Sequence, residues 1–159
     1  MTPAIRTKNL TKYFGDFTAV NGISFEAKRG EIFGFLGPNG SGKTTTIRMM
    51  LGLLTPSVGE VQALGISVSG NQAELQQRTG YMSQRFSLYN DLTVQQNLQF
   101  YGAAYGLNNV DLKARILDAL SMAGLEGRED AKTKDLSGGW RQRLALSAAI
   151  LHRPELIFL

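Results

Sequence analysis

A glycine-rich segment in the first third of the chain has the residues needed to hold phosphate. Residues 37–44 read Gly-Pro-Asn-Gly-Ser-Gly-Lys-Thr and fit the pattern G-x-x-x-x-G-K-[ST]. Glycines permit positive φ angles, so backbone amides can converge on phosphate oxygens, and a following helix directs its positive end there. Lys43 would add a charge toward the β- and γ-phosphates, and the Thr44 hydroxyl could ligate Mg²⁺. We therefore predict that ATP or ADP binds with its phosphates against Asn39, Gly40, Ser41, Gly42, Lys43, Thr44 and Thr45.

The segments on either side of this loop fit that role. The apolar run at residues 31–36 predicts a strand that ends in a cluster of glycine and proline. Apolar residues recur at helical spacing over residues 44–53, which predicts a helix with one buried face. The alternative interpretation is a glycine-rich turn with an exposed lysine. The strand and the helix favour nucleotide binding, because the motif requires both.

A second pair of glycines lies near the end of the chain. Ser137, Gly138 and Gly139 precede a predicted helix over residues 140–152. Glycines that open a helix expose backbone amides, and with the Ser137 hydroxyl they could form a second anion-binding helix start. The alternative is an ordinary helix with Ser137 as its N-cap. From these residues alone, both interpretations stay open.

The segment Leu-Ser-Gly-Gly-Trp-Arg-Gln at residues 136–142 resembles the signature sequence of ATP-binding-cassette (ABC) ATPases, whose usual form is Leu-Ser-Gly-Gly-Gln. In that family the serine and glycines contact the γ-phosphate of ATP held by a partner cassette. The resemblance implies this role for Ser137, Gly138 and Gly139. Trp140 departs from the usual glutamine, which leaves the role of the fifth position open.

The resemblance extends over the whole chain and implies further site residues. The segment Thr-Lys-Tyr-Phe-Gly at residues 11–15 resembles the family's aromatic loop, whose ring stacks on adenine. Phe14 is the first choice for that ring and Tyr13 the second, with core packing as the alternative for either. Gln84 resembles the glutamine that helps to hold Mg²⁺ and senses the γ-phosphate. The implied Mg²⁺ ligands are Thr44 and Gln84, and the implied catalytic residues are Lys43 and Gln84.

The order of predicted elements indicates an α/β protein. Short β segments and the phosphate loop come first, helices follow, and a helix with an apolar strand comes last. Thr93 to Gln96 match a capping box, so a helix should run from there to about Tyr105, and another predicted helix ends at Gly124. The resemblance implies an ABC nucleotide-binding domain with a P-loop NTPase core. Its parts would be the antiparallel β subdomain with the phosphate-loop core (1–84), the helical signalling subdomain (85–135), and the signature helix with the final core strand (136–159).

In the family, the strand that matches residues 155–159 is followed by Asp-Glu, which order Mg²⁺ and polarise the attacking water. The printed sequence ends at Leu159. We therefore expect a fold that is incomplete at the C-terminus, and a 159-residue chain that binds ATP without appreciable hydrolysis. His152 precedes the strand, so it is not the family's switch histidine, and we expect it to interact with the dipole of its helix.

Composition argues against several other classes of protein. The 159 residues carry a net charge of +4 and no cysteine, so disulfides and thiolate metal sites are excluded, which fits a reducing compartment. The basic residues are scattered, so no nucleic-acid partner is expected. We expect no signal peptide and no membrane-spanning segment. Any membrane contact would therefore come through another subunit.

The sequence of residues 30–36 looks most like that of drug- and antibiotic-exporter ATPases. The resemblance implies a cytoplasmic subunit that binds ATP and Mg²⁺ and lies on the inner face of the cell membrane. Its partners would be a transmembrane permease and a second nucleotide-binding domain, in a homo- or heterodimer. One rival is an ABC-type ATPase that acts on the ribosome or nucleic acid, and another is a non-catalytic nucleotide-binding module. A DNA-repair relative is disfavoured, because residues 43–137 contain no sustained heptads of a coiled coil.

Overall fold

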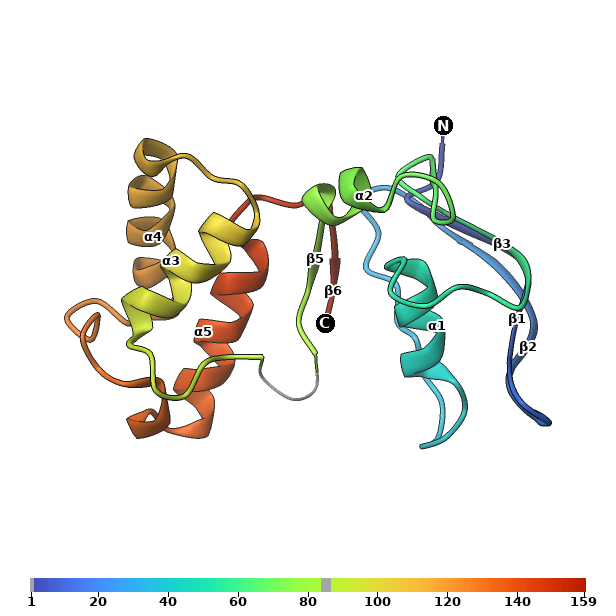
Figure 1. Cartoon of the computed structure of the whole chain (residues 1–159), viewed down its shortest axis with the longest axis horizontal. Helices are drawn as coiled ribbons and strands as arrows, with labels where there is room; N and C mark the ends of the chain where they lie inside the picture. Colours follow the sequence, from blue (N-terminus) through green and yellow to red (C-terminus); the bar gives the residue numbers. More distant parts are fainter. Residues whose placement is uncertain (1, 84–86) are drawn as a thin grey trace. The chain divides into compact units, whose positions relative to one another are not determined.

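The computed structural model describes residues 2–83 and 87–159, and the chain divides into two compact units, Met1–Thr79 and Gly80–Leu159 (Figure 1). The phosphate loop belongs to the first unit, and the glycine pair after Ser137 belongs to the second. Gln84, which the sequence assigns to metal binding and catalysis, lies outside the described residues.

The first unit is built on an antiparallel sheet in the strand order β2-β1-β3-β4. Its strands are β1 (Ile5–Phe14), β2 (Phe17–Ala27), β3 (Val58–Ala63) and β4 (Ile66–Ser67). β1 and β2 form a long hairpin whose turn contains Gly15 at φ 57°, a conformation that glycine adopts without steric cost. The antiparallel β layer predicted from the sequence is confirmed.

Two helices accompany this sheet. α1 (Lys43–Met50) begins directly after the phosphate loop, as predicted, and α2 spans Gln72–Arg78. α1 contacts both β2 and β3. Met49 and Met50 on its inner face are almost fully buried, and burying such a side chain stabilises the fold by about 1.5–3 kcal/mol. This packing holds α1 against the sheet.

Residues 31–36 do not form the predicted strand. Phe33 stacks on Phe25 of β2, with ring centroids 5.2 Å apart, whereas Ile32 and Leu36 are 100% and 94% exposed. A strand exists only with a hydrogen-bonded partner, and no described segment pairs with this run. The prediction was wrong because an apolar pattern shows which side chains favour burial but does not supply the partner.

The second unit contains three helices of the described chain (Figure 1), which pack around one apolar core. They are α3 (Val94–Ala104), α4 (Asn109–Ala123) and α5 (Gly138–Ile150), and a 3-10 turn lies at Thr133–Asp135. Leu98, Leu120 and Leu144, one from each helix, are buried together. β5 (Thr79–Tyr81) pairs with β6 (Leu156–Phe158). The apolar core fixes α5, and with it the glycine pair at the start of that helix.

The caps predicted for these helices are confirmed. The Gln96 amide donates to the Thr93 hydroxyl at 3.1 Å, and the Thr93 amide donates to the Gln96 side chain at 2.9 Å. Gly124 ends α4 in the left-handed conformation, at φ 67°. α5 begins at Gly138 rather than at the predicted Trp140. Within the described residues, no helix has the length and apolar character needed to cross a bilayer.

Candidate nucleotide-binding site

The phosphate loop, residues 37–44, leads straight into α1. Gly40 and Gly42 have φ angles of 83° and 85°, in the left-handed region that glycine enters at little cost. The Ser41 amide donates to the Pro38 carbonyl at 3.2 Å and closes a turn within the loop. The backbone therefore requires glycine at two positions of the motif.

Gly42 is also held by the neighbouring strand. A Cβ on Gly42 would lie 2.4 Å from the carbonyl oxygen of Ala19 and 3.0 Å from the Val20 side chain. The obstacle at Ala19 is backbone of β2, which cannot yield without disturbing the sheet. The loop is therefore seated against the same hairpin that carries Phe14.

Lys43 is the first residue of α1, and its ammonium lies over the loop. Its Nζ donates to two loop carbonyls, that of Pro38 at 2.7 Å. The first turn of α1 has no acidic residue, so nothing there neutralises the positive end of the helix dipole. Thr44 is exposed at this helix start, whereas Thr46 is buried and its hydroxyl donates to the Gly42 carbonyl at 2.9 Å. A helix start with a lysine beside it is an arrangement that binds anions.

Phe14 and Tyr13 lie at the end of β1, beside the hairpin turn. Their side chains are 50% and 46% exposed, so neither ring is packed inside a core. Phe17, which pairs with Phe14 across the turn, is exposed as well. Lys12 Nζ lies 5.4 Å from the centre of the Phe14 ring. The hairpin that reaches Gly42 thus carries accessible aromatic rings at its tip.

The N-terminus of α5 is exposed, with open space around its first residues. Ser137 occupies the N-cap position, but its hydroxyl makes no capping hydrogen bond. Ser137, Gly138 and Gly139 are all exposed, and a Cβ on either glycine would meet nothing within 4 Å. The first turn of α5 contains no acidic residue. The Ser137 hydroxyl and the first helix amides are therefore accessible to an anionic ligand.

Trp140, the departure from the usual signature, packs against the apolar core of the second unit. The guanidinium groups of Arg128 and Arg143 each lie 5.2 Å from its ring, and such contacts contribute about 0.5–1 kcal/mol at exposed sites. Neither arginine contact was predicted from the sequence. The i,i+3 spacing of Trp140 and Arg143 could have revealed one of them, whereas Arg128 is brought to the ring only by the fold.

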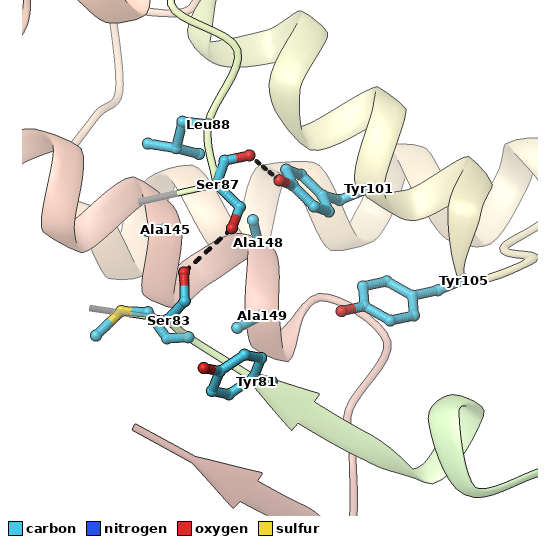
Figure 2. A pocket seen from close by; sticks show the side chains of 10 residues that line it. Tyr81, Ser83, Ser87, Leu88, Tyr101, Tyr105, Ala145, Ala148 and Ala149 are labelled. Carbon is cyan, nitrogen blue, oxygen red and sulfur yellow. Dashed lines mark hydrogen bonds between the residues drawn. The ribbon is translucent and has the colours of Figure 1, made fainter. Parts of the chain in front are cut away.

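A small pocket lies between residues of α3, α5 and the segment after β5 (Figure 2). Its volume is about 30 Å³, enough for a couple of water molecules and far too small for a nucleotide. The Tyr101 hydroxyl donates to the Ser87 carbonyl, and the Ser83 and Ser87 hydroxyls lie 3.2 Å apart. Burial raises the pKa of Tyr101 above its ordinary value near 10, and Tyr89 and Tyr105 add to the shift. The hydrogen bonds at this pocket help to stabilise the second unit. The pocket is not the nucleotide site.

His152 follows α5 and stacks on Tyr105, with ring centroids 3.6 Å apart. Burial raises the pKa of the Tyr105 hydroxyl. The sequence predicted an interaction of His152 with the helix dipole and did not predict this ring contact, which joins residues far apart in the chain.

The described residues contain no group of three His, Cys, Asp or Glu side chains that could hold a metal ion. Mg²⁺ commonly takes one or two protein ligands and completes its shell with phosphate oxygens and water. Thr44, exposed at the start of α1, fits that mode because its hydroxyl is next to the phosphate loop. The second ligand predicted from the sequence, Gln84, lies outside the described residues.

The phosphate loop, its helix and the antiparallel hairpin beside it define a mixed α/β protein with a candidate phosphate-loop nucleotide site. The sequence profile of the ABC transporter family matches residues 20–159. The chain therefore belongs to the ABC transporter family, as the signature and the aromatic loop indicated.

Known proteins of this family align with nearly the whole chain. It is 45% identical over 155 residues to the probable multidrug ABC transporter ATP-binding protein YbhF of Escherichia coli, covering 98% of this chain and 27% of that protein. It is 39% identical to the Nod factor export ATP-binding protein I of Ralstonia nicotianae, covering 98% of this chain and 49% of that protein. A solved ATP-binding cassette, a dimer in a post-hydrolysis state with ADP and Pi, superposes with a TM-score of 0.83 at 30% identity, over 96% of this chain and 72% of that one. The chain thus spans about half or less of the lengths of these two curated relatives.

Proposed function

We propose that this chain is the ATP-binding part of an ABC exporter, in which ATP binding and hydrolysis power a transmembrane permease. The observation that supports it most strongly is the phosphate loop, where Gly42 is seated against Ala19 and Lys43 begins α1. The relatives are named for multidrug transport and Nod factor export, which favours transport over action on the ribosome or nucleic acid.

In this proposal the nucleotide phosphates lie against residues 39–45. The loop amides and the positive end of α1 face the phosphates, and Lys43 exchanges its loop carbonyls for phosphate oxygens. Phe14 stacks on adenine, since its ring is accessible at the hairpin tip. Mg²⁺, when bound, would neutralise charge on the β- and γ-phosphates, with Thr44 and Gln84 as its protein ligands.

The open start of α5 supports a second role, in a pair of cassettes. Ser137, Gly138 and Gly139 have accessible donors but no lysine at the helix start. We infer that they contact the γ-phosphate of ATP that Lys43 holds in a partner cassette, so that two nucleotides lie at the interface. A related cassette, solved as a dimer with ADP and Pi, supports the pairing of two cassettes.

The other proposed roles belong to three consecutive segments of the chain. We propose that residues 1–84 bind nucleotide, that residues 85–135 dock on the permease, and that residues 136–159 carry the signature helix and a core strand. The protein would then lie at the cytoplasmic face of the membrane, held there through the permease.

Hydrolysis needs a carboxylate to orient water and a metal held by more than one protein ligand. We propose that the intact protein hydrolyses ATP.

Co-purification tests the transport role. The intact protein, carrying an affinity tag, would be recovered from detergent-solubilised membranes and from ribosome fractions of the same cells. We expect a stoichiometric polytopic membrane protein in the first and no enrichment of ribosomal proteins in the second. Recovery with ribosomes and without a membrane partner would overturn the exporter assignment and support the ribosome-acting alternative.

A further inference from the structure

Lys12 is placed where it can orient the ring that we propose stacks on adenine. It is half-buried on β1, and its Nζ lies 5.4 Å from the centre of the Phe14 ring. The same Nζ donates to the Thr55 carbonyl at 2.8 Å. The ammonium is thus held by a hydrogen bond while it contacts the ring.

The anchor at Thr55 belongs to a segment that also binds the backbone of β1. The Tyr13 amide donates to the Ser57 hydroxyl at 3.1 Å, and the Ser57 amide donates to the Thr11 carbonyl at 2.9 Å. Residues 55–57 lie between α1 and β3. The strand end that carries Phe14 is therefore fastened to the segment that leaves the phosphate-loop helix.

The Lys12 ammonium lies over the Phe14 ring, 5.4 Å from its centroid. A cation attracts the negative face of an aromatic ring, so Lys12 occupies one face of Phe14 and restrains its rotation. Phe14 is nevertheless 50% exposed as a residue. A ring that is already ordered loses less conformational entropy when a base stacks on it.

We propose that Lys12 is a positioning residue for nucleotide binding: it holds the Phe14 ring so that the face away from its ammonium receives the base. The inference rests on the proposed nucleotide site and names a residue of that site with no contact to the phosphates. Lys12 therefore contributes to binding of ligands that carry a base and not to binding of the polyphosphate alone.

The test compares a ligand that has a base with one that lacks it. MgATP and magnesium tripolyphosphate would be titrated calorimetrically into the intact protein and its variants. Lys12→Met keeps the length of the side chain and removes its charge, and we expect it to weaken MgATP about two- to five-fold, the range of an exposed cation–π contact. Tripolyphosphate affinity should not change. Lys12→Arg should restore ATP affinity, because a guanidinium also binds an aromatic face.

Two further variants separate the possible explanations. Lys8→Met removes the same charge from an exposed position of the same strand, and it should alter neither affinity. In a Phe14→Ala background, Lys12→Met should cause no additional loss, because the ring through which it acts is gone.

Three results would overturn the role of Lys12: unchanged ATP affinity in Lys12→Met, equal weakening of both ligands, or no rescue by Lys12→Arg. Equal weakening would indicate a general charge or folding effect. If Phe14→Ala itself left ATP affinity unchanged, base stacking on this ring would be wrong. Loss of ATP affinity in Phe14→Ala with none in Lys12→Met would reject only the positioning role.

Discussion

The two glycine-containing helix starts of this chain are built differently. At α1, Gly42 has a φ of 85° and no room for a Cβ beside Ala19, and Lys43 lies over the loop. At α5, Gly138 and Gly139 have open space around them. Both starts lack acidic residues, so both offer a positive helix end.

The difference supports our proposal that the two helix starts bind the same kind of anion in two modes. The α1 start is a shaped loop with its own charge, which suits a ligand that must be held by this chain alone. The α5 start supplies donors on an open surface, which suits a phosphate that is brought by another molecule. The α5 helix is held by the apolar core behind it, and no tight loop shapes its start.

Among the substitutions that test this comparison, Gly42→Ala should have the largest effect on ATP affinity. Its methyl would lie 2.4 Å from the Ala19 carbonyl oxygen, and its backbone would be strained at φ 85°. We expect ATP affinity to fall at least about ten-fold, the equivalent of 1.4 kcal/mol, because the loop must move off β2.

Two glycines of this chain provide the controls for that substitution. Gly30→Ala has the same kind of strain, at φ 74° with open space around it, and should cost about 1 kcal/mol of stability without weakening ATP. Gly138→Ala should leave the free energy of unfolding unchanged or raised, since alanine is the better helix former. Titration and urea denaturation measure both quantities, and equal ATP loss in Gly42→Ala and Gly30→Ala would contradict the seating of the loop.

Arginine at Ser137 tests the open helix start. The long cation would fill the surface where a partner's nucleotide is proposed to lie, whereas the phosphate loop of the same chain is unchanged. We expect Ser137→Arg in the intact protein to abolish ATP-driven dimerisation and to keep monomeric ATP affinity within about two-fold, well under the 1.4 kcal/mol of a ten-fold change. Sedimentation velocity with and without ATP distinguishes the two effects. Loss of monomeric binding would place the signature in the site of its own chain.

Substituting one of the two aromatic rings at the hairpin tip should have a smaller effect on ATP affinity. Phe14→Ala should weaken ATP by about 1–3 kcal/mol, by analogy with base stacking on aromatic side chains. Tyr13→Ala should weaken it less, because the Lys12 ammonium contacts Phe14 and no such cation contact is seen at Tyr13 among the described residues. Equal losses in a titration of both variants with MgATP would reject this assignment.

The smallest effect is expected at Tyr101, in the supporting pocket of the second unit (Figure 2). Tyr101→Phe removes the hydroxyl that donates to the Ser87 carbonyl, and should cost about 1 kcal/mol of stability at pH 7 without changing monomeric ATP affinity. The raised pKa of Tyr101 means that its hydroxyl stabilises the fold below about pH 10 and that this stability is lost as the pH rises further. Urea denaturation at pH 7 and above pH 10 should therefore show the difference between wild type and variant shrinking. If the stability difference between wild type and Tyr101→Phe did not change with pH, the stabilising role of the Tyr101 hydroxyl would be contradicted.

Local signals in the sequence predicted most of the helices and the loop. The capping box at Thr93, the left-handed Gly124 and the motif at residues 37–44 each depend on a few neighbouring residues. Because the interactions that stabilise these features are local, the sequence pattern is enough to predict them. The run at residues 31–36 failed because a strand depends on a partner that a pattern cannot provide.

Contacts between distant residues account for what the sequence could not predict about the candidate site. The fit of Gly42 against Ala19 depends on how the loop lies on β2. The hydrogen bond from Lys12 to the Thr55 carbonyl joins residues that only the sheet brings together. The neighbours of Trp140 are partly local, at Arg143, and partly distant, at Arg128. Motifs thus predicted the candidate residues, and the fold determines how they are held.

The most direct test of the two modes of binding is one ATP titration of two variants. Lys43→Ala and Ser137→Arg would be compared with wild type at protein concentrations where the protein is monomeric. Removal of a charge-assisted phosphate contact costs about 1.5–3 kcal/mol, so Lys43→Ala should weaken MgATP at least about ten-fold, whereas Ser137→Arg should bind like wild type. Wild-type affinity in Lys43→Ala, or an equal loss in Ser137→Arg, would contradict the account.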